Sequence, residues 1–221
     1  MWRRYLALAV ILTGVIACSG CRQKHAGPTA PPSPQATPRA EGTGGAQGEL
    51  AGKRILMVVA PKDFRDEEYT MPRMMFEDAG ASVRVASTEA GTATGVSGAK
   101  APVDLLASDA KAADFDAVVF VGGPGMVAHL GDADLIRLAK ESAQAGKVTA
   151  AICVAPTILA NAGVLKGVEA TAWPDQESAL KAKGAIWSSK TAVRSGKIVT
   201  ANGPEAAHPF ASLVIEALKD G

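Results

Sequence analysis

The stretch that predicts the fold is Val148-Thr-Ala-Ala-Ile-Cys153-Val-Ala-Pro156. Its first residues are β-branched or small and apolar, which is typical of a strand buried on both faces. Pro156 stands at the expected first position of a short helix and Gly163 just past its end, where each residue type is favoured. Cys153 is therefore predicted to lie at a sharp strand-to-helix junction, among small side chains.

This junction has the form of a nucleophile elbow, a strained turn that presents one reactive side chain above the end of a sheet. The sulfur of Cys153 would lie at a helix N-terminus, where free N–H groups and the helix dipole stabilise a thiolate. The alternative is that Cys153 is a small buried core residue, as free cysteines often are.

The rest of the chain alternates between strands and helices. Strands are predicted over 54–60, 82–86 and 116–121, a hairpin over 192–200, and helices over 67–79, 133–145 and 204–219, with short β pieces over 91–109. This alternation predicts a single α/β domain, with a doubly wound, mostly parallel sheet and helices on both faces. Ligands of such sheets bind beyond the carboxyl ends of the strands. Cys153, Gly122-Gly123 and the loop after the first strand all fall there.

Composition limits the classes of function. The 221 residues are 48% hydrophobic and can bury one sizeable core. The net charge of +1 supplies no broad positive field, so nucleic acid is not an expected partner. The three cysteines, at positions 18, 21 and 153, form neither a disulfide framework nor a metal-ligand spacing. We expect no metal and no cofactor.

Residues 1–17 are predicted to be a signal peptide of the lipoprotein type. Arg3-Arg4 precede an apolar run, 6–16, that is too short to span a membrane comfortably. The run ends in Val15-Ile-Ala-Cys18, which resembles the bacterial lipobox. Lipidated Cys18 would anchor the exported chain to a membrane, on the periplasmic side in a Gram-negative cell. The alternative is an ordinary cleaved signal and a soluble exported protein.

Residues 18–50 are rich in proline, glycine and alanine and contain little to bury. We expect them to form the lipidated N-terminus and a disordered tether. Residues 51–221 are then the folded domain.

Two segments carry a family resemblance. Ala150-Ala-Ile-Cys153-Val-Ala-Pro156, followed by Ile158-Leu-Ala-Asn-Ala-Gly-Val-Leu-Lys-Gly167, resembles the cysteine segment of the ThiJ/PfpI family. This family belongs to the superfamily of the parkinsonism protein DJ-one, with a flavodoxin-like fold related to class I glutamine amidotransferases. The resemblance runs from about Lys53 to the C-terminus and implies a possible homodimer.

The family pairs its cysteine with a glutamate four residues before a proline, and Glu68-Tyr-Thr-Met-Pro72 matches that spacing. The resemblance therefore implies that Cys153 and Glu68 are the catalytic pair. A buried, protonated Glu68 would donate a hydrogen bond to sulfur, so we expect a thiol pKa below the usual value of about 8.5. The alternative is that Glu68 is a surface acid at the start of the helix, which is what we expect of Glu67.

Gly122-Gly123 matches the family's glycine pair after a central strand. The backbone N–H groups of both glycines and of Val154 are the expected donors to a developing oxyanion. An ordinary glycine turn is the alternative.

Both histidines that family members place near the cysteine are absent. PfpI-type members have one directly after the cysteine, where this chain has Val154, and DJ-one-type members have one before a later proline, where it has Trp173. His129 or His208 could approach Cys153 in space, but no spacing indicates it. A Cys-His-acid protease triad is thus unsupported, which favours chemistry that needs only a thiolate and a nearby acid.

Three functions remain open. The resemblance favours an enzyme of the glyoxalase or deglycase kind, in which Cys153 adds to a small carbonyl substrate such as methylglyoxal or acts on its adducts, and Glu68 moves the proton. The second is a redox-sensing or protective module whose thiolate is oxidised to a sulfinate. The third is a non-catalytic binding or chaperone-like domain.

Overall fold

The computed structural model describes residues 48–220. The predicted signal peptide, Cys18 and nearly all of the predicted tether lie outside these residues. Within the described part of the chain, no helix combines the length and the apolar character needed to cross a membrane.

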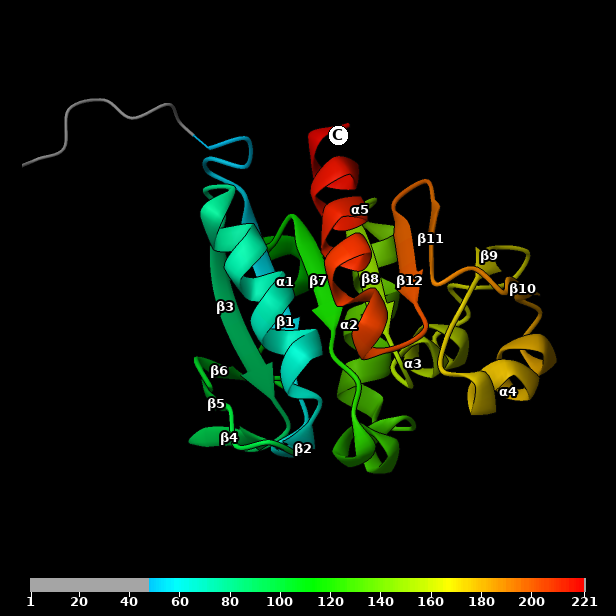
Figure 1. The fold of residues 1–221 in the computed structure, drawn as a ribbon, viewed down its shortest axis with the longest axis horizontal. Coiled ribbons are helices and arrows are strands. Elements are labelled where there is room, and N and C mark those ends of the chain that lie inside the picture. Colours follow the sequence, from blue (N-terminus) through cyan, green and yellow to red (C-terminus); the bar gives the residue numbers. More distant parts are fainter. Residues whose placement is uncertain (1–47, 221) are drawn as a thin grey trace, which may run out of the picture. The chain divides into compact units, whose positions relative to one another are not determined.

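A seven-stranded sheet forms the centre of the described domain (Figure 1). Its strand order is β11-β12-β8-β7-β1-β3-β6, and every neighbouring pair is parallel except β11 with β12. The strands are β1 (Arg54–Val58), β3 (Ser82–Ser87), β6 (Leu105–Leu106), β7 (Ala117–Phe120), β8 (Val148–Ile152), β11 (Ala192–Ser195) and β12 (Ile198–Ala201). The predicted α/β class with a mostly parallel sheet is confirmed.

Helices cover both faces of this sheet. α1 (Asp66–Asp78) packs against α5 (Ala207–Lys219), and α2 (Ala133–Gln144) packs against α3 (Pro156–Asn161). The two pairs lie on opposite faces (Figure 1), and β8 contacts both α5 and α2. Every residue of β7 and β8 is buried, as expected for central strands that are covered twice.

Smaller elements lie outside the central sheet. A three-stranded sheet consists of β2 (Lys62–Phe64), β4 (Thr92–Gly95) and β5 (Lys100–Pro102). A separate pair consists of β9 (Glu169–Ala170) and β10 (Ile186–Trp187), and α4 (Glu177–Ala182) lies between these two strands in the sequence. The short β pieces predicted over 91–109 are present. β2 lies inside a predicted loop, and β9, α4 and β10 were not predicted, because such short elements carry no hydrophobic period.

The packed domain begins slightly before residue 51. Leu50 is fully buried, and its N–H donates a hydrogen bond to the carbonyl of Ala79 (2.8 Å). Glu49 forms an ion pair with Lys219 (2.9 Å). These contacts place the last residues of the predicted tether on the domain.

Candidate active site

The strand-to-helix junction at Cys153 is as sharp as predicted. β8 ends at Ile152 and α3 begins at Pro156, and Cys153 between them has φ +64°. Residues other than glycine avoid this left-handed region, which costs about 1–2 kcal/mol. The backbone is held on both sides, since the Cys153 N–H donates to the carbonyl of Ala201 (2.9 Å) and its carbonyl accepts from Trp173 N–H (2.7 Å).

Three neighbouring strands bring the candidate residues together. Cys153 follows β8, Gly122 follows β7, and Glu68 lies in the first turn of α1, after β1. Their side chains converge on Gly122: a Cβ there would lie 2.6 Å from Cys153 Cβ and 2.8 Å from Glu68 Oε2. Only glycine leaves room for the cysteine and the carboxyl group to meet.

Glu68 is fully buried, whereas its neighbour Glu67 is exposed. Glu68 Oε2 accepts a hydrogen bond from Gly122 N–H (3.0 Å), and Oε1 has no partner among the described residues. Burial raises the pKa of Glu68 to about 7, although the Cys153 thiol, Gly122 N–H and Arg65 act in the opposite direction. The surface-acid alternative therefore holds for Glu67 and not for Glu68.

The Cys153 side chain is also buried, with 6% of its surface exposed. Burial raises the pKa of the Cys153 thiol to about 12; the negative charge of Glu68 adds to this, and the Gly123 and Val154 N–H groups oppose it. The predicted lowering of the thiol pKa is wrong, because a sequence shows neither how completely sulfur is desolvated nor that Glu68 ionises first. Between the two values, the pair holds a single proton.

The backbone donors differ in part from the prediction. Gly122 N–H is already bonded to Glu68, so it is not free to meet an oxyanion. The N–H groups of Gly123 and Val154 lie beside the sulfur and lower its pKa. Gly123 has φ +108°, and a Cβ there would lie 2.4 Å from Arg65 N, so this position also requires glycine.

A cavity of about 430 Å³ opens beside Cys153. Its size suits a small molecule. Its lining residues are Arg65, Gly123, Pro124, Val127, Cys153, Val154, Trp173, Asp175, Gln176 and Pro204. Neither His129 nor His208 is one of them, so residues 48–220 place no histidine in this cavity for a protease triad. A core-packing cysteine would also have a raised pKa, but the left-handed φ, the buried glutamate and this cavity distinguish Cys153 from one.

Sequence reasoning missed three polar residues of this cavity: Arg65, Asp175 and Gln176. Arg65 precedes α1 in the loop that leads to Glu68, and the other two lie in the 3-10 turn 174–176 before α4. Proximity to Glu68 was the one available signal for Arg65. The turn at 174–176 has no regular pattern that would have placed it opposite Cys153.

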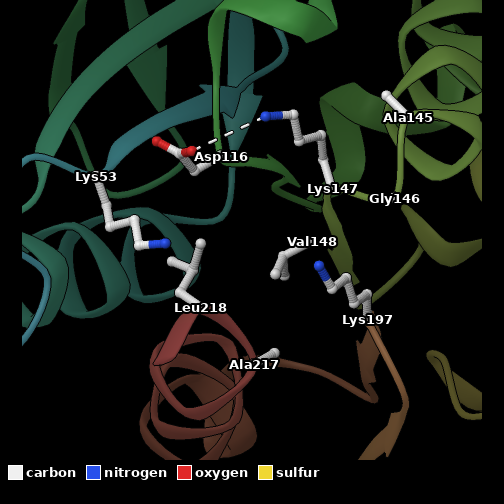
Figure 2. Close-up of a pocket in the computed structure, with 9 residues that line it drawn as sticks. All are labelled: Lys53, Asp116, Ala145, Gly146, Lys147, Val148, Lys197, Ala217 and Leu218. Atoms are coloured by element: carbon white, nitrogen blue, oxygen red, sulfur yellow. Dashed lines mark ion pairs between the residues drawn. The ribbon is translucent and has the colours of Figure 1, made fainter. Parts of the chain in front are cut away.

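A second cavity, of about 200 Å³, lies at the other end of the strands (Figure 2). Lys53, Asp116, Lys147 and Lys197 surround it, each directly before a strand of the central sheet. Lys147 Nζ lies 3.9 Å from Asp116 Oδ1. This cavity contains neither a cysteine nor a buried acid. Nowhere in residues 48–220 do three His, Cys, Asp or Glu side chains gather as metal ligands would.

Comparison with known proteins gives consistent results. Residues 53–217 match the model of the DJ-1/PfpI family. The chain is 41% identical over 173 residues to an uncharacterized protein of Methanocaldococcus jannaschii, covering 77% of this chain and 84% of that one. It is 30% identical over 166 residues to a deglycase of Pyrococcus horikoshii, covering 75% and 99% of the two chains.

Among solved structures, a ThiJ/PfpI domain protein from Brachyspira murdochii superimposes with a TM-score of 0.74 at 39% identity. The match covers 76% of this chain and 97% of the other. The family match starts at Lys53, where the sequence resemblance was expected to start. The elbow, the buried glutamate and the glycine pair thus lie within the matched residues, and this chain belongs to the DJ-1/PfpI family.

Proposed function

We propose that this protein is a cysteine-dependent enzyme that acts on small reactive aldehydes or their adducts, in the manner of a glyoxalase or deglycase. The observation that carries the proposal is the buried pair of Cys153 and Glu68, whose cysteine lines a cavity sized for a small molecule. Relatives at about 30% identity are named deglycases, which supports the same chemistry.

Glu68 is suited to move the proton of the thiol. A general base is most effective when its pKa lies near the working pH, and burial raises the pKa of Glu68 to about 7. As sulfur bonds to the carbonyl carbon, Glu68 takes the thiol proton and then passes it to the carbonyl oxygen, which completes a hemithioacetal. The N–H groups of Gly123 and Val154 stabilise the negative charge during the addition.

The test is turnover of methylglyoxal by the full chain, followed by loss of the dicarbonyl and appearance of lactate. Cys153→Ser should abolish turnover, and Glu68→Leu should lower kcat at least about 100-fold, the typical contribution of a general acid–base. Lys147→Met, at the opposite end of the sheet, is the control and should retain wild-type turnover. Turnover that persists in Cys153→Ser would refute the proposal.

The redox function is the second candidate. One observation favours it: the Gly123 and Val154 N–H groups beside the sulfur could donate hydrogen bonds to the oxygens of a sulfinate. Treatment with dilute peroxide should then add two oxygens to Cys153 by intact mass without loss of the fold. If the protein neither turns over methylglyoxal nor gains oxygen, the binding or chaperone-like function is the remaining candidate.

We also propose that the protein is exported and anchored to a membrane through lipidated Cys18. The support is the lipobox-like segment 15–18 after an apolar run. Intact-mass analysis of the mature chain should find an N-terminal cysteine with diacylglyceryl and acyl groups in the membrane fraction. An unmodified mature chain in the soluble fraction would contradict this.

A further inference from the structure

The cavity beside Cys153 contains a cation that the proposed proton transfer does not use. Arg65 is the one positively charged residue among those lining the cavity. Its charge reaches the reacting pair, because Arg65 acts to lower the pKa of Glu68. The side chain is half-buried, so its charge is only partly screened by water.

Asp66 and Glu68 lie close enough to feel the charge of Arg65, but no carboxylate of the described residues forms an ion pair with its guanidinium. Arg73, Arg137 and Arg194 each pair with a carboxylate. The Arg65 guanidinium makes neither an ion pair nor a hydrogen bond with residues 48–220, and its Nε is buried without a partner. A buried donor left unsatisfied costs about 1–3 kcal/mol, so fold stability does not explain why arginine stands here.

The position is unfavourable for a cation in a second way. Arg65 is the N-cap residue of α1, where the helix dipole places partial positive charge. Its backbone is fixed, since Arg65 N–H donates to the carbonyl of Gly122 (3.1 Å) beside Glu68 and Cys153. The Arg65 side chain thus lines the cavity without a hydrogen-bonded carboxylate, although acidic residues follow it in the first turn of α1.

Two polar neighbours complete the surroundings. Gln176 Oε1 accepts from Thr157 Oγ1 (2.9 Å), while its amide N–H groups have no partner among the described residues. Asp175 also lines the cavity, but it is exposed and forms no ion pair with Arg65. A ligand with two anionic oxygens could therefore meet the terminal nitrogens of Arg65, whose planar pair of donors matches a carboxylate.

We propose that Arg65 determines specificity by binding the carboxylate of the substrate, so that the preferred substrates are small aldehydes that carry a carboxylate rather than neutral dicarbonyls. This inference rests on the proposed carbonyl chemistry for the substrate class. The binding of the carboxylate by Arg65 is measurable without turnover.

The test compares two alkylating reagents that differ in charge. Iodoacetate and iodoacetamide both transfer a two-carbon group to the Cys153 sulfur with loss of iodide, and only iodoacetate carries a carboxylate. Both rates depend on the thiolate fraction of Cys153, so an effect of a substitution on the thiol pKa cancels in their ratio. Arg65→Gln should lower the iodoacetate-to-iodoacetamide ratio about tenfold, the factor for one charge-assisted hydrogen bond at a half-exposed site.

Two variants serve as controls. Arg73→Gln removes the same charge from α1 at a residue that pairs with Glu77, outside the Cys153 cavity, and should leave the ratio unchanged. Arg65→Lys keeps the charge and should recover part of the ratio. An unchanged ratio in Arg65→Gln, or an equal fall in Arg73→Gln, would overturn the role of Arg65.

A second measurement separates this inference from the proposed function. Calorimetric titration should show pyruvate binding to the wild type more tightly than its neutral analogue butanedione, with pyruvate affinity about tenfold weaker in Arg65→Gln. If pyruvate binding depends on Arg65 but no carbonyl compound is turned over, the proposed enzymatic function is refuted and carboxylate binding by Arg65 is retained. If methylglyoxal is turned over but pyruvate binding does not depend on Arg65, the enzymatic function is retained and carboxylate binding by Arg65 is refuted.

Discussion

The two ends of the central sheet are built from the same strands, yet their charged side chains differ in burial and in pairing. At the amino ends, Lys147 and Asp116 are partly exposed and face each other (Figure 2). At the carboxyl ends, Glu68 is fully buried with one oxygen unpaired, and Arg65 has a buried Nε without a partner. Water solvates the first set of charges, whereas the second set must be stabilised by the protein or by a ligand.

The backbone differs in the same way. Both ends contain a residue at φ +64°: Gly146 beside the lysine cavity and Cys153 beside the other. Glycine adopts this conformation without strain, and cysteine does not. Strain and unsatisfied charge therefore occur together at one end, and this coincidence identifies the candidate active site better than the presence of a cavity does.

The largest expected effect is the pH dependence caused by Glu68. Its pKa rises from 4.5 to about 7 in the folded protein, so the folded state keeps this proton longer than the unfolded state. Stability should therefore fall by about 3 kcal/mol as pH rises from about 4.5 to 7, and should then level off. Glu68→Gln should remove this fall and Lys147→Met should keep it, as measured by urea unfolding at each pH.

Parallel curves for the wild type and Glu68→Gln would show that the buried acid has an ordinary pKa. The measurement should stay below about pH 8, because the raised pKa of Cys153 adds its own fall in stability above the usual thiol value of about 8.5.

The next effect compares one glycine at each end. Gly122→Ala places a Cβ 2.7 Å from the carbonyl oxygen of Ile152, whereas a Cβ at Gly146 meets nothing within 4 Å. We expect a loss of about 3 kcal/mol from overpacking at Gly122 and about 1 kcal/mol from backbone strain at Gly146. Equilibrium unfolding in urea measures both, and equal losses would mean that the contacts at Gly122 relax freely.

A smaller effect tests the strain at Cys153. Cys153→Gly should be about 1 kcal/mol more stable than Cys153→Ala, because only glycine relaxes at φ +64°. In the middle of β8, Ala150→Gly should have the opposite sign and destabilise the protein. Thermal unfolding of the three variants gives the comparison, and a Cys153→Ala variant as stable as Cys153→Gly would argue against a strained elbow.

The smallest effect is expected at the lysine cavity. Lys147→Met removes a partly exposed ion pair of 3.9 Å, which should change stability by less than about 0.5 kcal/mol. Labelling of Cys153 by iodoacetamide should be unchanged. A large change in either quantity would show that the two ends of the sheet are coupled.

Sequence patterns were sufficient for the features that have a period or a strong local signal. The buried strands before Cys153 and Gly122 are continuous apolar runs, and Pro156 and Gly163 bracket α3. The spacing of Glu68 to Pro72 identified the glutamate that meets the cysteine. Each of these signals is local, so it survives without knowledge of the tertiary structure.

The remaining features depend on distances between segments. The pKa of Cys153 rises because the folded protein desolvates it beside Glu68, and Gly122 N–H is occupied because that carboxyl group turns toward it. Arg65 and Gln176 face one cavity only after the turn before α4 packs near Cys153. No local sequence pattern predicts such contacts between distant segments. The two-residue strands β9 and β10 are also too short to show a hydrophobic period.

The backbone hydrogen bond from Cys153 N–H to the Ala201 carbonyl has a consequence for folding during synthesis. Ala201 is the last residue of β12, so nearly the whole domain must be synthesised before this hydrogen bond can form. Until then the cysteine is an ordinary thiol on an unfinished chain, since contacts between distant segments form late. The strand-to-helix turn at Cys153 therefore gains this hydrogen bond only once β12 is in place.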